Sequence, residues 1–236
     1  AFLVTFKREF SRRLLFNKVS PKFRFERQFI KKLSAIVGQD DYGLQGMIDE
    51  IRSRVEVQIS GVDFTPVVLL SKNWPEFPKS MSENITLPEP LDRILSEYKQ
   101  NYKHEQKRLD WSMYTFHQVV VQANFPKGTC ELSTNLLQAA IVLLFNETEK
   151  WTVAQIATRL NICERTARAG LVSLNEKYRI LVKVVKEKRE VKDSGEEIYK
   201  YNQNFQDRGG QRLKVPPLKI QSEMHHRSQF LVKDKK

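Results

Sequence analysis

The sequence is poor in the residues that build disulfide or metal-held frameworks. Its cysteines are Cys130 and Cys163, which lie far apart and belong to no Cys-x-x-Cys motif. This pattern excludes a disulfide framework and favours a reducing compartment. None of the four histidines has the spacing to a Cys, Asp or Glu that would define a metal site. We therefore expect no metal site and no cofactor in this chain.

Long apolar runs are also lacking. The longest, Leu136–Phe145, holds about ten residues and is interrupted by Gln138, whereas a membrane-spanning helix needs about 20. We expect a soluble protein with no membrane partner. The first residues contain no initiator Met and lack the order of a signal peptide. The expectation is an internal fragment of an intracellular protein of the nucleus, the cytoplasm or both.

A catalytic constellation is missing too. Cys163 precedes a predicted helix, but no histidine is near it in the sequence to activate its thiol. We interpret it as a small packed turn residue. Gly209-Gly210 lacks the frame of a phosphate-binding loop and is typical of a turn. No catalytic residue is assigned, and the chain is expected not to be an enzyme.

Basic charge is abundant but uneven. The net charge is +12, divided as +5 over residues 1–57, −1 over 58–125 and +8 over 126–236. Basic segments of this kind attract nucleic acid, a membrane surface or an acidic protein partner. Charge alone does not choose between these partners.

Helical periodicity dominates the first quarter of the chain. Phe2, Phe6, Phe10 and Leu14 are spaced four apart and would form one apolar stripe. Similar spacing recurs twice, which predicts helices over 2–14, 24–37 and 43–53. Residues 1–57 are therefore predicted to form the end of a helical bundle.

The middle of the chain changes character. The β-prone run Val67–Leu70 is closed by Asn73 and Pro75, which predicts a buried strand. A helical face over 91–98 and an alternating stretch over 109–121 follow, and the latter predicts a hairpin or a long bent strand. Residues 58–125 are predicted to form a small α/β segment.

The last third has the element order of a winged helix. Helices are predicted over 134–146, 152–160 and 164–177, with Thr152 as the N-cap of the second. Strands at Ile180–Val185 and Ile198–Tyr201 would flank a charged loop. We predict a winged-helix domain over 126–205, then a short strand near 212–215 and a tail within 206–236. The fold class is α+β, mainly α.

A winged helix raises a nucleic-acid hypothesis. Positions that would face bases and phosphates, or an acidic partner, carry a set of basic residues: Arg165, Arg168, Lys177, Lys186, Lys188 and Arg189. The third helix also contains the small residues Ala167, Ala169, Gly170 and Ser173, which suit close helix packing and offer little base-reading chemistry. Nucleic acid therefore stays an alternative partner.

The order of the motifs resembles that of the cullin family over most of the chain. The segments that carry the resemblance are Ser11 to Leu15, Phe29 to Leu33, Gly43 to Met47, Asp63-Phe64-Thr65, Val68-Leu69, Trp74-Pro75, Leu87-Pro88, Arg108 to Trp111, Leu143 to Glu147, Asn202 to Phe205 and Arg212 to Val215. Each match is short, and their order and spacing give the resemblance its weight.

The resemblance implies a scaffold subunit of a cullin-RING E3 ubiquitin ligase. The family takes a strand of a RING-box protein into an intermolecular sheet; the RING then recruits a ubiquitin-charged E2, and zinc is expected only in that RING partner. The residues implied for this sheet are Val67, Val68, Leu69, Leu70, Trp74, Trp111, Met113 and Thr115. A substrate adaptor would bind an N-terminal part outside this chain.

One family feature is not carried over. The resemblance implies a terminal Ile-Val-Arg-Ile-Met-Lys motif whose lysine accepts the ubiquitin-like modifier Nedd8, and that motif does not occur in this sequence. No Nedd8 acceptor is therefore assigned, including at Lys233, Lys235 or Lys236. Whether the parent protein carries the modification stays open.

Overall fold

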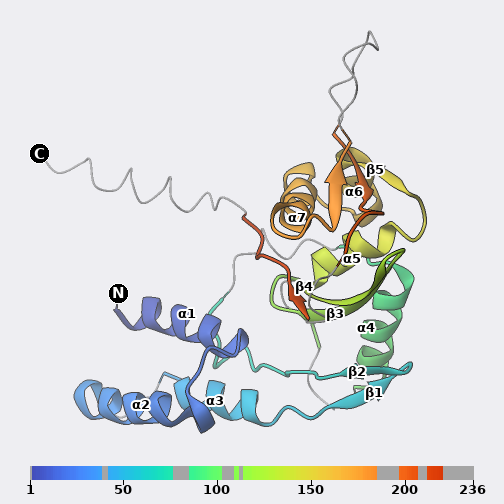
Figure 1. Cartoon of the computed structure of the whole chain (residues 1–236). Coiled ribbons are helices and arrows are strands. Elements are labelled where there is room, and N and C mark those ends of the chain that lie inside the picture. Colours follow the sequence, from blue (N-terminus) through green and yellow to red (C-terminus); the bar gives the residue numbers. More distant parts are fainter. Residues whose placement is uncertain are drawn as a thin grey trace, which may run out of the picture. The chain divides into compact units, whose positions relative to one another are not determined.

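The chain divides into two compact units in the computed structural model (Figure 1). The structure describes residues 2–38, 42–76, 85–102, 109–111, 114–184, 197–206 and 212–219. Unit 1 comprises residues 1–82 and 93–116, and unit 2 comprises residues 83–92 and 117–236. The predicted fold class, α+β and mainly α, is confirmed.

Three helices and one turn of 3-10 helix begin unit 1. They are α1 (Phe2–Leu15), η1 (Pro21–Phe23), α2 (Arg24–Val37) and α3 (Leu44–Arg52). The ends of the three α-helices lie within one residue of their predicted positions, and η1 was not predicted. Their inward faces form one cluster that includes Phe10, Leu14, Ile30, Leu44, Met47, Ile48, Ile51 and Trp74. The spacing of apolar residues that predicted the helices is thus also what builds this core.

A buried carboxylate joins the first two helices. Glu26, whose side chain is 2% exposed, accepts hydrogen bonds from Arg13 Nη2 at 3.0 Å and from the Ser20 backbone N–H at 3.1 Å. The Ser20 hydroxyl donates a third. Burial raises the pKa of Glu26, but the bonds from Ser20 and the charge of Arg13 outweigh it and lower the pKa. Glu26 therefore stays ionised and fixes the turn between α1 and α2.

A short hairpin and a helix are the other regular elements among the described residues of unit 1. Strands β1 (Val57–Ile59) and β2 (Val62–Phe64) pair antiparallel through Ser60-Gly61, whose φ angles of 50° and 78° suit a tight hairpin turn. Helix α4 spans Glu89–Asn101, and its first four residues are grouped with unit 2. The predicted helical face over 91–98 is confirmed.

In the middle of the chain, the predicted strand at Val67–Leu70 was wrong, and the predicted hairpin or bent strand over 109–121 is confirmed only for residues 118–121. Residues 65–70 form no regular structure, and neither do the described residues of the 109–117 stretch, where 114–116 are a turn. Strand β3 begins only at Gln118. A β-prone run becomes a strand only where a neighbouring backbone completes a ladder, and the described part of the chain supplies no such neighbour here.

A hairpin opens unit 2. Strand β3 (Gln118–Phe125) pairs antiparallel with β4 (Gly128–Asn135), and β8 (Leu213–Lys214) joins β4 in parallel, which gives the order β3-β4-β8. Strand β4 was not predicted. The predicted domain boundary after residue 125 falls in the turn of this hairpin, whereas the units change at 116/117, because the eight-residue ladder keeps both strands together.

The remainder of unit 2 has the element order predicted for a winged helix. Helices α5 (Leu136–Leu144), α6 (Val153–Leu160) and α7 (Glu164–Glu176) lie within two residues of their predicted bounds. They combine with strands β5 (Lys150–Thr152), β6 (Leu181–Lys183) and β7 (Ile198–Tyr201) in the order β5-β7-β6. Strand β5 was not predicted.

Capping and close packing fix these helices. Thr152 accepts from the Gln155 N–H at 3.1 Å, which confirms the predicted N-cap. The amide of Gln138 on α5, 1% exposed, donates to Ser173 Oγ on α7 at 2.8 Å and to the Pro216 carbonyl at 2.7 Å. The small residues of α7 thus serve helix packing.

Among the helices of the described ranges, none combines the length and the apolar character of a membrane-spanning segment.

Candidate functional site

The strongest candidate site in unit 1 is the stretch Thr65–Leu70, called here the 65–70 segment. Its four residues Val67 to Leu70 are all half-buried. Val67 and Leu69 pack against the helical cluster. This alternation is that of an extended chain, in which successive side chains point to opposite sides. The segment therefore has one side against the core and another directed away from it.

One carboxylate fastens the end of this segment. Glu50, near the end of α3, accepts three hydrogen bonds: from the Leu70 backbone N–H at 2.8 Å, from Asn73 Nδ2 at 2.6 Å and from Trp74 Nε1 at 2.7 Å. Trp74 is 6% exposed and belongs to the helical cluster. Bonds to an ionised acceptor are among the stronger ones in proteins. Glu50 thus ties residues 70–74 to α3.

Two glycines let Asn73 approach α3 closely. A Cβ atom at Gly46 would lie 2.5 Å from Asn73 Nδ2, and one at Gly43 would lie 3.1 Å from Asn73 Cα. No side chain fits at the first distance unless Asn73 moves. Position 46 in the first turn of α3 therefore requires glycine, because a side chain there would keep the Asn73 amide from reaching Glu50.

The backbone just before this anchor is unpaired. Within the part of the chain that the structure describes, the N–H and C=O groups of Val67, Val68 and Leu69 form no hydrogen bond. Half-buried backbone groups are satisfied in native proteins by water or by a partner chain. The 65–70 segment thus offers backbone groups to an added strand.

Strand β3 in unit 2 offers a second open edge. Among the described strands it pairs only with β4, so its other edge carries unpaired N–H and C=O groups. Gln118–Phe125 contains no charged residue, and Val120 is 48% exposed. Native edge strands usually carry charge or a bulge that discourages pairing. An uncharged eight-residue edge therefore favours a partner strand.

The other residues predicted for this site are placed less closely together. Trp111 is half-buried, with its ring 6.0 Å from that of Tyr98 on α4. Thr115 is half-buried in the turn 114–116, and Met113 lies outside the described residues. The structure therefore groups Val67, Leu69 and Trp74 around the helical core and leaves Trp111 and Thr115 in separate surroundings.

The basic residues of α7 are largely engaged by acids or rings. Arg168 Nε lies 2.9 Å from the Glu197 carboxylate, and Lys183 Nζ lies 2.7 Å from the same carboxylate. Hydrogen bonds from both cations lower the pKa of Glu197. Lys177 lies 4.7 Å from the centre of the Tyr178 ring. Arg165 is exposed on α7.

The remaining residues predicted for that surface, Lys186, Lys188 and Arg189, are outside the described residues. Because Glu197 offsets one of the two positive charges of Arg168 and Lys183, the described face of α7 is less cationic than its sequence indicates. The nucleic-acid hypothesis stays a prediction.

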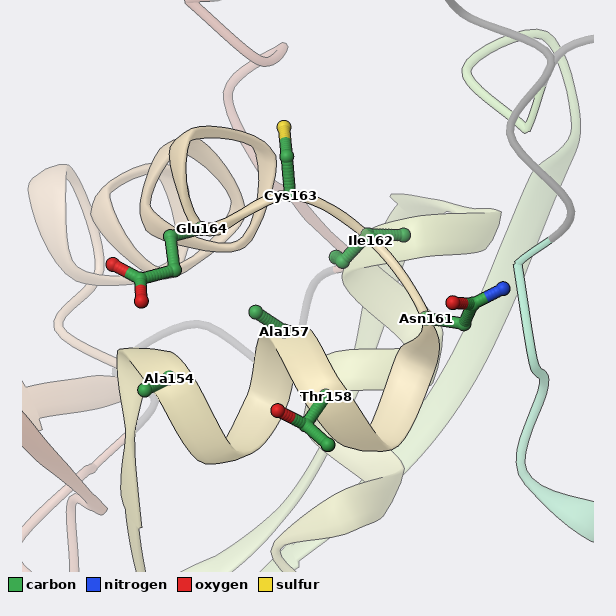
Figure 2. Close-up of a pocket in the computed structure, with 7 residues that line it drawn as sticks. All are labelled: Ala154, Ala157, Thr158, Asn161, Ile162, Cys163 and Glu164. Atoms are coloured by element: carbon green, nitrogen blue, oxygen red, sulfur yellow. The ribbon is translucent and has the colours of Figure 1, made fainter.

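A pocket of about 530 Å³ lies where α6 meets the start of α7 (Figure 2). Its lining includes Ala157 and Thr158 of α6, then Ile162 and Cys163 of the turn. The prediction of a packed Cys163 was wrong, because its side chain is exposed, with its sulfur 3.1 Å from Thr166 Oγ1. Among the described residues, no group of His, Cys, Asp or Glu could hold a metal ion.

Sequence reasoning missed Glu50, the hub of the candidate site. Its three donors come from positions 20, 23 and 24 residues further along the chain, and nothing local marks such a long-range partner. Gly46 inside a predicted helix was the one available signal, since glycine there often marks a close backbone or side-chain approach.

Comparison with known proteins gives a family match. Residues 68–205 match the model of the cullin alpha+beta domain. The chain is 28% identical over 232 residues to Cullin-2 of Arabidopsis thaliana, and 29% identical over 232 residues to Cullin-1 of Oryza sativa subsp. japonica. Each alignment covers 91% of this chain and 30% of the relative. Cullin-4A of Mus musculus is 26% identical over 84% of the chain and 27% of the relative.

Proposed function

The chain belongs to the cullin family, and from this membership we propose that it is the RING-binding segment of a scaffold for an E3 ubiquitin ligase. The chain spans about 30% of the length of the two plant cullins compared above. The proposal therefore concerns what this segment contributes to a larger assembly.

The observation that carries the proposal is the unpaired backbone of Val67 to Leu69 beside the Glu50 anchor. A strand of a RING-box protein would pair with these groups, so that main-chain hydrogen bonds supply affinity. The half-buried side chains of the 65–70 segment would fix the register of the added strand.

The chain itself would contribute position, not chemistry. The RING partner would hold the zinc and recruit the ubiquitin-charged E2, while a substrate adaptor would bind a part of the scaffold outside this chain. Holding the E2 and the substrate on one scaffold raises their effective concentration. No side chain of this chain needs to act as an acid, base or nucleophile in that mechanism.

The proposal is tested by co-expressing the chain with a RING-box protein and measuring the affinity of the purified pair. Two variants, Val67→Pro and Val68→Pro, each remove one backbone N–H that has no acceptor among the described residues. Adjacent N–H groups of an extended chain point in opposite directions, so one of the two variants removes a donor from the intermolecular ladder. We expect at least a tenfold loss of affinity, or about 1.4 kcal/mol, for that variant.

The matched controls are Val67→Thr and Val68→Thr, which keep the N–H and the branched shape. Both should bind with nearly the affinity of the wild-type chain. A wild-type chain that forms no complex at micromolar concentration would refute the proposal. A complex that tolerates both proline variants would leave the scaffold role standing and exclude the 65–70 segment as the docking strand.

A further inference from the structure

We propose that Glu50 is a positioning residue that holds the 65–70 segment ready for the partner strand before the partner arrives. The inference rests on the proposed function, because it assigns a role within the same docking site. Three donors from one short stretch, Leu70, Asn73 and Trp74, converge on the two oxygens of this carboxylate.

The geometry separates the anchor from the docking groups. Oε2 of Glu50 accepts from the Leu70 N–H and the Trp74 indole, and Oε1 accepts from the Asn73 amide. All three bonds lie on the C-terminal side of Val67–Leu69, whose own backbone groups are unpaired within the described chain. Glu50 thus restrains the segment without occupying the hydrogen bonds that a partner strand needs.

The apolar contacts alone leave the segment less restrained. Val67 and Leu69 touch the helical cluster from one side only and are half-buried. Such contacts are non-directional and do not fix where backbone N–H and C=O groups point. Directional hydrogen bonds that Glu50 accepts supply that orientation, and the buried Trp74 side chain holds this end of the segment in the core. Ordering a loop in advance lowers the cost of binding.

Binding specificity for an extended strand follows from this arrangement. A partner that pairs with Val67–Leu69 must present its own N–H and C=O groups in line, so the fitting partner is a β-strand. A helix satisfies its backbone groups internally and has none to offer. The anchor therefore selects an extended segment of the RING-box protein.

The test compares Glu50→Ala, Glu50→Gln and Asp49→Asn in complex formation with a RING-box protein. Glu50→Ala removes all three acceptor bonds. In Glu50→Gln the amide oxygen can keep Leu70 and Trp74 while the side chain of Asn73 turns over to accept from the new NH₂ group. Asp49 is the control, since it is the neighbouring acid, is 56% exposed, and contacts Arg27 and Arg52 instead of the segment.

We expect Glu50→Ala to bind the RING-box protein at least tenfold more weakly than the wild-type chain. Glu50→Gln should recover most of that affinity, and Asp49→Asn should match the wild type. A direct readout is the hydrogen exchange of the Trp74 indole N–H by NMR, assigned with Trp74→Phe. It should exchange faster in Glu50→Ala while the amides of α3 stay protected.

The outcomes separate the two proposals. A wild-type chain that binds no RING-box protein refutes the proposed function and this inference with it. A wild-type chain that binds, together with Glu50→Ala of equal affinity, refutes the positioning role alone. If Glu50→Ala does not fold, Trp74→Phe replaces it, because this change removes one donor to Glu50 and keeps an aromatic ring in the core. The positioning role would also be refuted if both Trp74→Phe and Gly46→Ala bound the RING-box protein with the affinity of the wild type.

Discussion

Gly170 on α7 allows a direct test of how the helices of unit 2 pack. A methyl group added at Gly170 would lie 2.3 Å from Cδ1 of Ile141 on α5, well inside the normal carbon–carbon contact distance of roughly 3.5–4.0 Å. Ile141 is fully buried, so this side chain has little room to move. The other neighbours of the added methyl are 3.8 Å away, at ordinary contact distance.

The expected size of the effect follows from two opposing contributions. Replacing Gly by Ala inside a helix stabilises it by about 1 kcal/mol, and overpacking a core costs about 1–3 kcal/mol. We therefore expect Gly170→Ala to destabilise unit 2 by about 0–2 kcal/mol. Ile141→Val, which removes the clashing Cδ1, should cost about 0.5–1.5 kcal/mol by itself.

The double variant is the informative one. In Gly170→Ala with Ile141→Val, the added methyl occupies the space that Cδ1 leaves, so the pair should be more stable than the sum of the single changes by about 1–2 kcal/mol. Stability is measured by denaturant unfolding, with fluorine NMR of fluorotryptophan at position 151 as the probe, because Trp151 lies in unit 2. The control pair replaces Ile141→Val with Ile156→Val, another fully buried isoleucine, and should be additive.

Additivity of Gly170→Ala and Ile141→Val to within about 0.5 kcal/mol would refute the reasoning. It would mean that the close approach of α5 and α7 is not what requires glycine at Gly170. The control pair is expected to be additive, so the deviation from additivity is compared between the two pairs.

Two further predictions concern charge. Because the folded-state pKa of Glu26 is lowered, its ionised carboxylate should stabilise unit 1 at neutral pH and lose that contribution as pH falls below about 4.5. In urea unfolding, the difference in stability between the wild type and Glu26→Gln should therefore be larger at pH 7 than at pH 3.5. An unchanged difference would contradict this prediction. Glu197→Gln removes the carboxylate that Arg168 and Lys183 share. This variant should therefore bind duplex DNA more tightly than the wild type at low salt, with an affinity that falls as salt rises. Equal binding of the two proteins in an electrophoretic mobility assay would contradict this prediction.

Local periodicity was enough to locate the helices. Phe6, Phe10 and Leu14 share one face because a helix repeats every 3.6 residues, and α1 buries that face against α3. The capping residue Thr152 and the small residues of α7 were equally visible in the sequence. Each of these features depends on residues a few positions apart.

The strands show where local reasoning fails. Val67–Leu70 has the composition of a strand, but a strand needs a neighbour, and the described chain provides none. In β4, Cys130, Leu132 and Thr134 are buried in alternation, yet their polar neighbours and Gly128 concealed the pattern. Pairing across a sheet is decided by distant or intermolecular partners that composition does not reveal.

The candidate site was half predictable for a similar reason. Motif order pointed to Val67–Leu70 and Trp74, and the structure places Val67, Leu69 and Trp74 in or against the helical cluster. Glu50 could not be recognised, because its role appears only when Asn73 and Trp74 fold back onto α3. The residues proposed for docking were thus easier to find in the sequence than the carboxylate that anchors the segment.

The central claim is that the 65–70 segment becomes a strand when a RING-box protein binds. Amide hydrogen exchange at Val67, Val68 and Leu69, measured for the chain alone and in the complex, tests this most directly. These amides have no internal acceptor in the described chain, so they should exchange fast when the chain is free. In the complex, alternate amides should become protected; a complex that forms while all three continue to exchange fast would contradict the claim.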